Sequence, residues 1–576
     1  MKQYIISGVA LLALMLPSCS EDNLEIPKKG VVSYEEFYSD PHNAENAATF
    51  VYQTGQYAHW CATGPSDWVW QGSIYVMQEA PSDEVYWASG DENDHISGLI
   101  LNEFRNTLDQ NLVTIKNSYA AFYNMIRGSN LLLDNYSFNM VADDAQLNSI
   151  VNRSVAEAKV SRAYAHFMLA TYWGNPPLVD KMISGDVKPG NTPHDDIINW
   201  CIAELDESAP YLPSKSSVND PDLSVRFTKE FAYALKGKIE VYNGKYAEGK
   251  ADLKKVIDSK LYELVDSKDM HKLYHVAGDC SKEWVFQYNY IDDYDNISYF
   301  DGQYSYHWVN STGWRHLNEY PNEVITTGWG SIMPSKSFGD ALIANDGMDS
   351  WRRQSWIVTY DEMIHGKKIG DDVVLSYPDD MPIAERGIDS KGVYGCGGYW
   401  QYKRIALVSE LIQRDRLATN MGVEINYPIM RYAEVLLLYA EACAQTGDDG
   451  TGLAALNLIQ DRAGSNHRST SCTLEEVKNE KRFECFLEGS RYADLVRWGD
   501  APTVMGEQGK EVPNAYDKIR KDNTIDADNA EARLDVQFRS YNNANGYGFK
   551  AGKHELMPYP FSATSINPNL VQNPGY

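Results

Sequence analysis

Aromatic side chains gather in one stretch of the chain, and they are the residues best suited to contact a ligand. Between Trp284 and Trp329, thirteen of 46 residues are aromatic, and most of the later ones stand among Asp, Asn, Gly and Ser. The whole chain has 39 Tyr and 14 Trp but only 16 Phe, which favours rings that carry a polar group and suit half-exposed surfaces. Flat rings and hydrogen-bonding side chains on loops are typical of a binding surface.

The first part of this stretch has a different pattern. Trp284, Phe286, Tyr288 and Tyr290 alternate with other residues at a period of two. This alternation predicts a buried face of a strand and not a set of ligand contacts. We therefore expect the binding rings to lie after residue 290.

Catalytic chemistry has less support in the sequence. Asp292, Asp293 and Asp295, or Asp371 and Asp372, offer carboxylates, but a glycosidase needs two carboxyl groups at a set separation across the bond. No H-E-x-x-H, G-x-S-x-G, Walker or Rossmann signature occurs in the right context. We predict a protein that is not an enzyme and has no cofactor. Calcium at the first acidic run stays an alternative, although that run lacks the spacing of an EF-hand.

The charge balance excludes one class of partner. The 576 residues contain 52 Lys and Arg against 80 Asp and Glu, for a formal net charge of -28. No basic stripe is visible that could neutralise phosphates. We therefore expect no nucleic acid among the partners.

The N-terminus predicts a membrane anchor. The apolar run Ile5–Leu16 is too short to span a bilayer and has the length of a signal-peptide core. It ends in Leu-Pro-Ser-Cys, which resembles the lipobox of bacterial lipoproteins, although Pro17 departs from the usual small or aliphatic residue. The resemblance implies that residues 1–18 are removed and that Cys19 carries lipid. A plain secretory signal is the alternative.

The segment behind that cysteine is acidic. Ser20–Glu25 resembles the surface-export signal of lipoproteins in some Gram-negative bacteria, so residues 19–30 are expected to form a lipidated linker outside the cell. Seven further cysteines have no C-x-x-C or zinc-like spacing, and two of them repeat with apolar residues at helical spacing. We therefore expect neither a metal framework nor a disulfide scaffold.

Long helices are expected on both sides of the aromatic stretch. Apolar residues fall on one stripe over Lys116–Tyr136 and again over Asn152–Trp173. Thr192 is expected to cap a following helix, with Pro193 at its first position.

Two helical hairpins with small residues at the crossing resemble the tetratricopeptide repeat, in which helix pairs stack. They lie at Phe231–Ile257 and from Tyr432 to beyond Ile459, and Thr473 with Glu476 forms a capping box for the next helix.

The intervening span shows no sustained helical period. It runs from about Leu261 to Asn426 and is too long for one structureless loop, so we expect an elaborated insert. Residues 31–576 are therefore expected to form one domain. Helix pairs would occupy about 110–260 and 428–498, and an irregular insert about 261–426.

Six segments in order resemble the SusD/RagB family of outer-membrane nutrient-binding lipoproteins, and the resemblance runs from end to end. They are Ala80–Glu84 (APSDE), Ala120–Asn130 (AAFYNMIRGSN), Arg162–Leu178 (RAYAHFMLATYWGNPPL), Tyr427–Ala442 (YPIMRYAEVLLLYAEA), Glu480–Gly499 (EKRFECFLEGSRYADLVRWG) and Asn567–Tyr576 (NPNLVQNPGY). The resemblance implies a mainly α fold in which tetratricopeptide-like helix pairs support an irregular, aromatic-rich half that carries the ligand site.

The resemblance also implies a function. Family members cap a TonB-dependent (SusC-like) transporter in the outer membrane and hand it oligosaccharides, or in some cases peptides. We therefore expect a non-catalytic cell-surface protein for glycan uptake, of the kind used in polysaccharide utilisation. The same scaffold binding peptide or another nutrient is one alternative, and a surface glycan hydrolase is another.

A sugar ring has an apolar face and an edge of hydroxyl groups, so its receptor needs an exposed flat ring together with amides, carboxylates or Arg. In the family, the loop after the Ser-Asp-Glu segment and aromatic residues of the insert form the site. Carried over, these positions are Trp87, Asp91 and Asn93 on the loop and Tyr299, Tyr304, Trp308 and Trp314 in the insert. No Trp follows Asp91, which departs from the starch-binding pattern, so a different sugar is expected.

The family motifs themselves are expected to be architectural. In the segment Glu480–Gly499, charges of both signs recur at near-helical spacing, which predicts internal ion pairs at a helix end. The final segment contains two Asn-Pro pairs and is expected to be a turn-rich tail.

Overall fold

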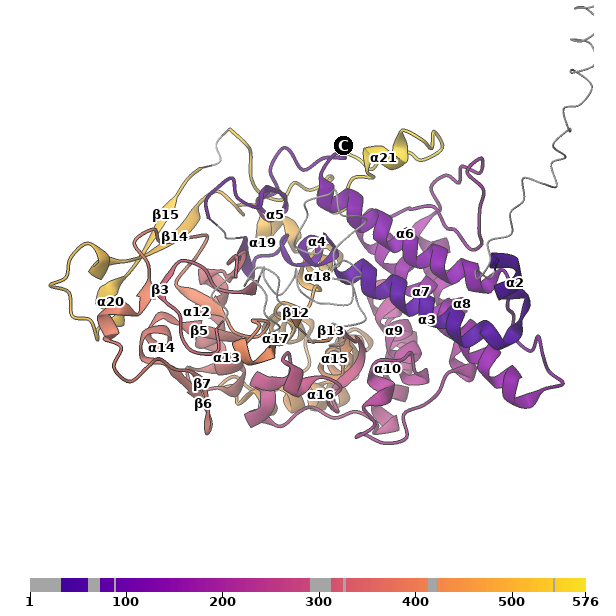
Figure 1. Cartoon of the computed structure of the whole chain (residues 1–576), viewed down its shortest axis with the longest axis horizontal. Coiled ribbons are helices and arrows are strands. Elements are labelled where there is room, and N and C mark those ends of the chain that lie inside the picture. The colour runs from indigo at the N-terminus through magenta and orange to yellow at the C-terminus, as the bar shows by residue number, and fades with distance from the viewer. Residues whose placement is uncertain are drawn as a thin grey trace, which may run out of the picture.

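The N-terminal part of the chain is built almost entirely of helices (Figure 1). The computed structural model describes residues 33–60, 73–87, 90–290, 312–324, 328–412, 422–423, 425–541 and 544–576. The helices of the N-terminal part are α2 (Tyr34–Ser39), α3 (Ala44–Trp60), α4 (Ser73–Glu79), α5 (Ile96–Glu103), α6 (Val113–Leu133), α7 (Ala145–Trp173), α8 (His194–Ser208), α9 (Lys229–Tyr242) and α10 (Tyr246–Ser259).

The two long amphipathic helices predicted here are present as α6 and α7, and each begins earlier than the apolar stripe suggested. Asp144 sets the start of α7, because its carboxylate accepts hydrogen bonds from two backbone N–H groups of the first turn. The predicted start of α8 is wrong by one residue. Pro193 is the N-cap, and the Thr192 hydroxyl instead accepts a hydrogen bond from the Leu178 backbone at 3.0 Å.

Both predicted helical hairpins are present. Gly244 turns the chain between α9 and α10 at φ 73°, a conformation that glycine adopts without strain. The second hairpin pairs α15 (Tyr432–Thr446) with α16 (Asp449–Ala463). Although about 170 residues separate the hairpins in sequence, α10 packs directly against α15, so the two hairpins stack as one scaffold.

The other half of the molecule carries short strands that pair only in twos and threes (left in Figure 1). All the pairs are antiparallel. The strands are β1 (Val85–Trp87), β2 (Trp284–Tyr288), β3 (Leu317–Glu319), β4 (Ile332–Pro334), β5 (Ile357–Thr359), β6 (Lys367–Ile369), β7 (Asp372–Leu375), β8 (Gly387–Ile388), β9 (Val393–Tyr394), β10 (Tyr399–Gln401), β11 (Leu411–Ile412), β12 (Gly422–Val423), β13 (Tyr427–Arg431), β14 (Val512–Asp517) and β15 (Leu534–Arg539).

The insert also contains helices, and here the expectation of no sustained helical period is wrong. Ser335 caps an eleven-residue helix by accepting a hydrogen bond from the Phe338 backbone, and Phe338 and Leu342 lie on its buried face. The apolar stripe is too short to stand out from the surrounding loops. Besides α15 and α16, the helices in and after the insert are α12 (Lys336–Asp346), α13 (Trp351–Trp356), α14 (Tyr360–His365), α17 (Leu474–Glu484), α18 (Arg491–Trp498), α19 (Ala501–Met505), α20 (Ala530–Arg533) and α21 (Phe561–Thr564).

The predicted aromatic strand is confirmed as β2. All five of its residues are buried, and it pairs with β13 at the entrance to α15. One large hydrophobic core joins the helix pairs to this strand, and a second core fills the irregular half between β5, β10 and α14. The fold is therefore mainly α, with a helical scaffold that supports an irregular half. Within the described part of the chain, no helix combines the length and the apolar character needed to cross a bilayer.

Candidate functional site

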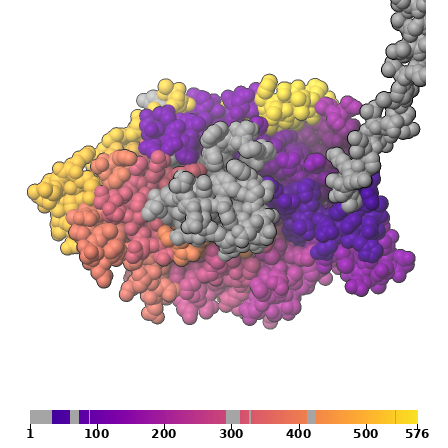
Figure 2. Space-filling model, viewed as in Figure 1, coloured from indigo at the N-terminus to yellow at the C-terminus, as the bar shows by residue number. Residues whose placement is uncertain are grey.

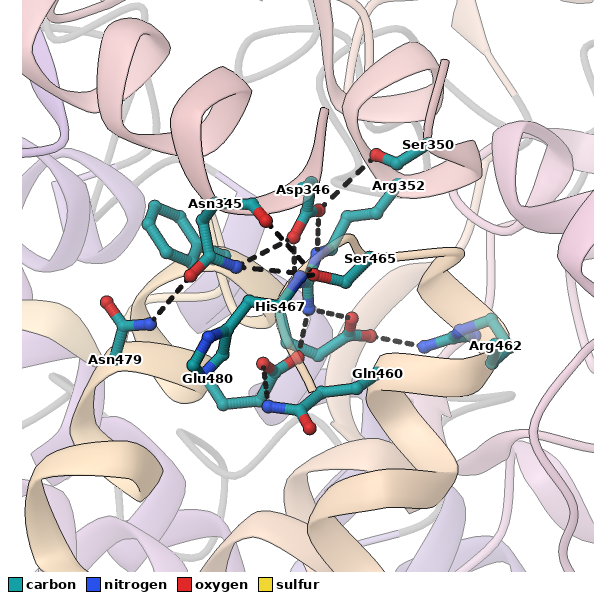
Figure 3. Close-up of polar contacts among 12 residues, drawn as sticks. Asn345, Asp346, Ser350, Arg352, Gln460, Arg462, Ser465, His467, Asn479 and Glu480 are labelled. Atoms are coloured by element: carbon teal, nitrogen blue, oxygen red, sulfur yellow. Dashed lines mark hydrogen bonds and ion pairs between the residues drawn. The ribbon is translucent and has the colours of Figure 1, made fainter. Parts of the chain in front are cut away.

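A cluster of charged side chains lies buried where α12, α13, α15, α16 and α17 meet (Figure 3). The Arg352 guanidinium donates to both oxygens of Asp346 at 2.7 Å and also to Glu480. Arg431 donates to Glu283 at 2.7 Å and to Glu484 at 2.6 Å. Both arginines are completely buried, and so are the carboxylates that they contact.

The electrostatics of this buried network are those of a structural element. Burial alone would raise the pKa of Glu484, but Arg462, Arg431 and Arg352 together hold it far below its usual range. Arg431 and Lys403 similarly lower the pKa of Glu488 to about 2 against the effect of burial. Neutralised charges without solvent access suit packing and not ligand binding.

This result confirms that the Glu480–Gly499 motif forms internal ion pairs. The Ser-Asp-Glu segment of residues 82–84 belongs to the same architecture, because the Asp83 carboxylate accepts from Arg491 at 2.7 Å and lies 3.1 Å from Arg482. Neither motif supplies an exposed group that could contact a ligand.

Two of the predicted binding rings are buried. Trp87 lies in β1 with no exposed surface, and a Cβ atom at Gly98 would come within 2.0 Å of its ring. Trp314 is also fully buried and donates from its indole nitrogen to the Gln401 carbonyl at 2.8 Å. The expectation that these two tryptophans present exposed faces is therefore wrong. Their neighbours in space, which the sequence does not show, make them part of the core.

The other predicted positions divide into two groups. Asp91 and Asn93 are exposed on the loop after β1, where the Asn93 backbone donates to the Asp91 carboxylate at 2.8 Å. Tyr299, Tyr304 and Trp308 lie outside the described residues, as does Cys19.

Three segments that are far apart in the sequence converge beside Asp91 and Asn93. The strands β1 and β4 are antiparallel, with Trp87 opposite Ile332, so the loop after β1 lies next to the residues that precede β4. A third segment, 313–316, joins them through a hydrogen bond from the Gly330 backbone to the Gly313 carbonyl at 2.8 Å. In Figure 2, the purple surface of the chain near residue 100 adjoins the pink surface of the insert.

An ion pair joins two of these segments. The Arg315 guanidinium donates to the Asp94 carboxylate at 2.7 Å, and the Gly90 backbone donates to the same carboxylate at 3.0 Å. About one third of each charged side chain is exposed, 31% for Arg315 and 34% for Asp94. Both side chains are therefore accessible to a bound molecule.

Two rings lie beside this ion pair. The imidazole of His95 and the half-buried indole of Trp329 have centroids 5.3 Å apart and are tilted by 40°. Burial lowers the pKa of His95 despite the neighbouring Asp94, so the ring is neutral near pH 7. His95 and His316 have φ values of 50° and 59°, a left-handed conformation that costs energy in residues other than glycine and recurs at functional sites.

We define the polar–aromatic site as Asp91, Asn93, Asp94, His95, Arg315 and Trp329. It combines a flat ring with carboxylates, an amide, a neutral imidazole and a guanidinium, which are the groups needed for the face and the edge of a sugar ring. Trp329 ends the aromatic stretch of the sequence but was not among the predicted binding residues, and neither were Asp94, His95 and Arg315. The Gly-Trp-Gly sequence of residues 328–330 was an available signal, since glycines next to an aromatic residue favour a loop.

The acidic runs that were candidate catalytic carboxylates do not form a second site in the described part of the chain. Asp372 pairs with Lys272 at 2.8 Å and with His271 at 3.0 Å, whereas Asp292, Asp293 and Asp295 lie outside the described residues. Among the residues that are described, no group of three or more His, Cys, Asp or Glu side chains could hold a metal ion. The core encloses a cavity of about 50 Å³, which is far below the 300–1,000 Å³ or so of ordinary ligand pockets.

Comparison with protein families agrees with this architecture. Residues 282–576 match a family model described as "SusD family", and residues 68–241 match one described as "Starch-binding associating with outer membrane". A "SusD-like protein" of Bacteroides ovatus is 22% identical over 512 residues, which cover 85% of this chain and 81% of that protein.

Solved structures show the same fold. A structure titled "Laminarin binding SusD-like protein" superposes with a TM-score of 0.69 at 21% identity and covers 93% of this chain and 99% of its own. The surface glycan-binding protein A of Bacteroides thetaiotaomicron in complex with laminarihexaose has a TM-score of 0.67 at 17% identity, with 92% of this chain and 99% of its own covered. Because the first family model spans more than half of the sequence and these structures share the fold, this chain belongs to the SusD family.

Proposed function

We propose that this protein is a non-catalytic glycan-binding lipoprotein of the cell surface, which captures oligosaccharides and delivers them to a TonB-dependent transporter. The observation that carries the proposal is the polar–aromatic site. Its half-buried Trp329 ring lies beside His95 and the Arg315–Asp94 ion pair, with the exposed Asp91 and Asn93 on the same loop.

Two kinds of contact with the sugar are expected in the complex. A pyranose would stack its apolar face on Trp329, while hydroxyl groups at the ring edge exchange hydrogen bonds with Arg315, His95 and Asn93. Because Arg315 and Asp94 neutralise each other at 2.7 Å, this part of the site favours a neutral sugar over a uronate. The names of two similar structures point to laminarin and laminarihexaose, so β-linked glucose oligosaccharides are the first ligands to test.

Two features favour binding without hydrolysis. The Asp94 carboxylate accepts hydrogen bonds from Arg315 and from the Gly90 backbone, an arrangement that suits a positioning contact and not proton transfer to a leaving group. Two of the similar solved structures are named as binding proteins.

The attachment of the protein to the membrane and the transport of its ligand are inferred from the sequence. Lipid on Cys19 would hold the folded part at the outer membrane, and the family resemblance implies a TonB-dependent transporter that moves the ligand onward. Co-purification from mild detergent tests this step. A SusC-like transporter should be recovered with the native protein, and the Cys19→Ala variant should lose lipid labelling. Recovery of the protein alone under conditions that preserve related pairs would contradict delivery to a transporter.

The binding step is tested by calorimetry with laminarihexaose and maltohexaose, together with a hydrolysis assay on the same sugars. Trp329→Ala should weaken binding about tenfold to a hundredfold, since stacking on an aromatic ring is worth about 1–3 kcal/mol. Phe561→Ala is the matched control, because Phe561 is 54% exposed and lies on α21, outside the polar–aromatic site. Equal affinity of both variants, or release of shorter sugars by the wild type, would overturn the proposal.

A further inference from the structure

A second surface feature lies on the helical half, away from the polar–aromatic site. A groove of about 350 Å³ runs between α6, the segment 177–189 and the residues that follow α21. In Figure 1 these elements meet beside α21, and in Figure 2 the yellow surface of the C-terminal residues borders the purple helices. We call it the α6 groove.

The walls of the α6 groove are apolar and exposed. Ile126 of α6 forms its floor, Ile183 and Val187 form one side, and Ile566 forms the other. The exposed fractions are 38% for Ile183, 49% for Val187 and 66% for Ile566. Exposed apolar side chains that share one groove are typical of a surface that another chain covers.

The polar rim of the α6 groove is basic. Arg127, Lys181 and Lys188 line it, and no Asp or Glu is among its described lining residues. None of these three cations has an ion-pair partner among the described residues, where most Arg and Lys side chains of the scaffold are paired. Asp180 and Asp186 are exposed in the segment 177–189 but are not among the residues that line the groove, and the Asp134 carboxylate accepts from the Met182 backbone at 3.0 Å. An occupant of this groove should therefore be both apolar and acidic.

The chain itself contains such a segment. Ser20–Ile26 carries three acids, and its apolar Leu24 and Ile26 are two residues apart, so an extended chain would place both on one side. This segment lies outside the described residues, which begin at Ser33.

The distance from the described start of the chain to the groove is short. The Asn135 amide, just past the end of α6, donates to the Tyr34 hydroxyl at 3.2 Å. Arg127 lies eight residues earlier on the same helix, or about 12 Å along its axis. The seven residues that join Ile26 to Ser33 can extend about 23 Å, so the segment can reach the groove of its own chain.

We propose that the segment Ser20–Ile26 docks into the α6 groove, with Leu24 and Ile26 against its apolar walls and the acids at its basic rim. Docking shortens the free tether that follows Cys19 and holds the α6 face toward the membrane. The orientation of the α6 face toward the membrane rests on the proposed lipid anchor. The contact between the segment and the α6 groove requires neither lipid nor sugar.

Disulfide trapping tests the contact in the mature chain, residues 19–576, with Cys19→Ala so that no lipid is attached. Leu24→Cys combined with Ile183→Cys should form an intramolecular disulfide at least tenfold faster than Leu24→Cys combined with Val373→Cys. Val373 is the control, since it is 55% exposed on β7 in the irregular half. Non-reducing peptide mapping identifies the pair that has formed. Charge reversal at Lys181 and Lys188 should slow the first reaction several-fold, and high salt should do the same.

Equal rates for the two cysteine pairs would overturn the proposal, and so would a rate that is unchanged by charge reversal. A disulfide that forms only between chains, with a rate that rises with protein concentration, would also overturn it and would assign the α6 groove to a second copy. Glycan affinity is measured on the same samples. Loss of trapping with intact affinity contradicts the docking alone, whereas loss of affinity with intact trapping contradicts only the proposed function.

Discussion

Arginine and carboxylate meet in two very different regions of this protein. In the buried network, Arg431 contacts Glu283, Glu484 and Glu488 with no exposed surface on the arginine. In the polar–aromatic site, Arg315 donates to the Asp94 carboxylate, and each side chain stays about one third exposed.

The difference shows how one residue type serves either architecture or recognition. A fully buried arginine uses its donors on the protein, and removing it leaves the surrounding buried carboxylates with one cation fewer. An arginine that is about one third exposed, as Arg315 is, stays accessible to a ligand. Four predictions test this contrast.

The largest effect is expected at the buried network. Arg431→Met should lower the free energy of unfolding by about 3–5 kcal/mol, because Glu283, Glu484 and Glu488 lose their shared partner. Urea unfolding followed by circular dichroism measures the change. Arg468→Met is the control, since Arg468 and its partner Asp461 are each 56% exposed and should leave the midpoint unchanged. Equal midpoints for the two variants would show that the network does not stabilise the fold.

The tryptophans provide the second contrast. Trp87→Ala should cost about 3–5 kcal/mol of folding free energy, because its buried ring fills the space against Gly98. Trp329→Ala, which truncates a half-buried ring, should shift the melting temperature much less and weaken glycan binding much more. Calorimetric melting and glycan titration of both variants separate the two roles. The assignment fails if Trp87→Ala melts with the wild type.

A smaller effect is expected at the exposed ion pair. Arg315→Ala should reduce glycan affinity about tenfold, the loss of one charge-assisted hydrogen bond, and change stability by less than about 1 kcal/mol. Arg315→Lys should restore little of the affinity, because an ammonium cannot reproduce the planar geometry of a guanidinium. Titration with the sugar identified as a ligand measures both variants. Full affinity in Arg315→Ala would remove this residue from the site.

The smallest expected effect is the change in folding stability with pH that comes from the buried histidines. His166 donates from Nδ1 to the Arg162 carbonyl and accepts at Nε2 from the Val179 backbone, so only the neutral ring satisfies both contacts. Burial lowers the pKa of His166 to about 3 and that of His59 to about 4. The unfolded histidines take up protons below about pH 6.5 and the folded ones do not. The stability from these groups is therefore complete above about pH 6.5 and is lost as the pH falls.

Melting temperatures between pH 8 and pH 4.5 test this sign. Glu79 and Glu84, whose pKa values are raised by burial to about 7 and about 8, act in the opposite direction, so the test is the difference between two proteins. Below pH 6.5 the melting temperature of the wild type should fall relative to that of His166→Gln, because only the wild type loses the contribution of this imidazole. His42→Gln is the control, because the His42 side chain is 74% exposed and should not alter the profile. A difference in melting temperature between the wild type and His166→Gln that stays constant on acidification would contradict the neutral state of His166.

Much of the scaffold could be predicted from local patterns. The stripes of α6 and α7, the hairpins α9–α10 and α15–α16, and the buried strand β2 all appear in the sequence, since helical and strand periodicity depend on residues a few positions apart. The ion pairs of the Glu480–Gly499 motif were also predictable, because charges of both signs at helical spacing inside a buried helix must find partners.

The site itself was decided by tertiary structure. The sequence marks a region rich in aromatic rings, but it does not show that Gly98 packs on Trp87 or that Gln401 binds Trp314, which makes both rings core residues. The pairing of β1 with β4 brings His95 next to Trp329 across more than 230 positions of the chain. Such contacts depend on how separate elements pack, and no local spacing encodes that packing.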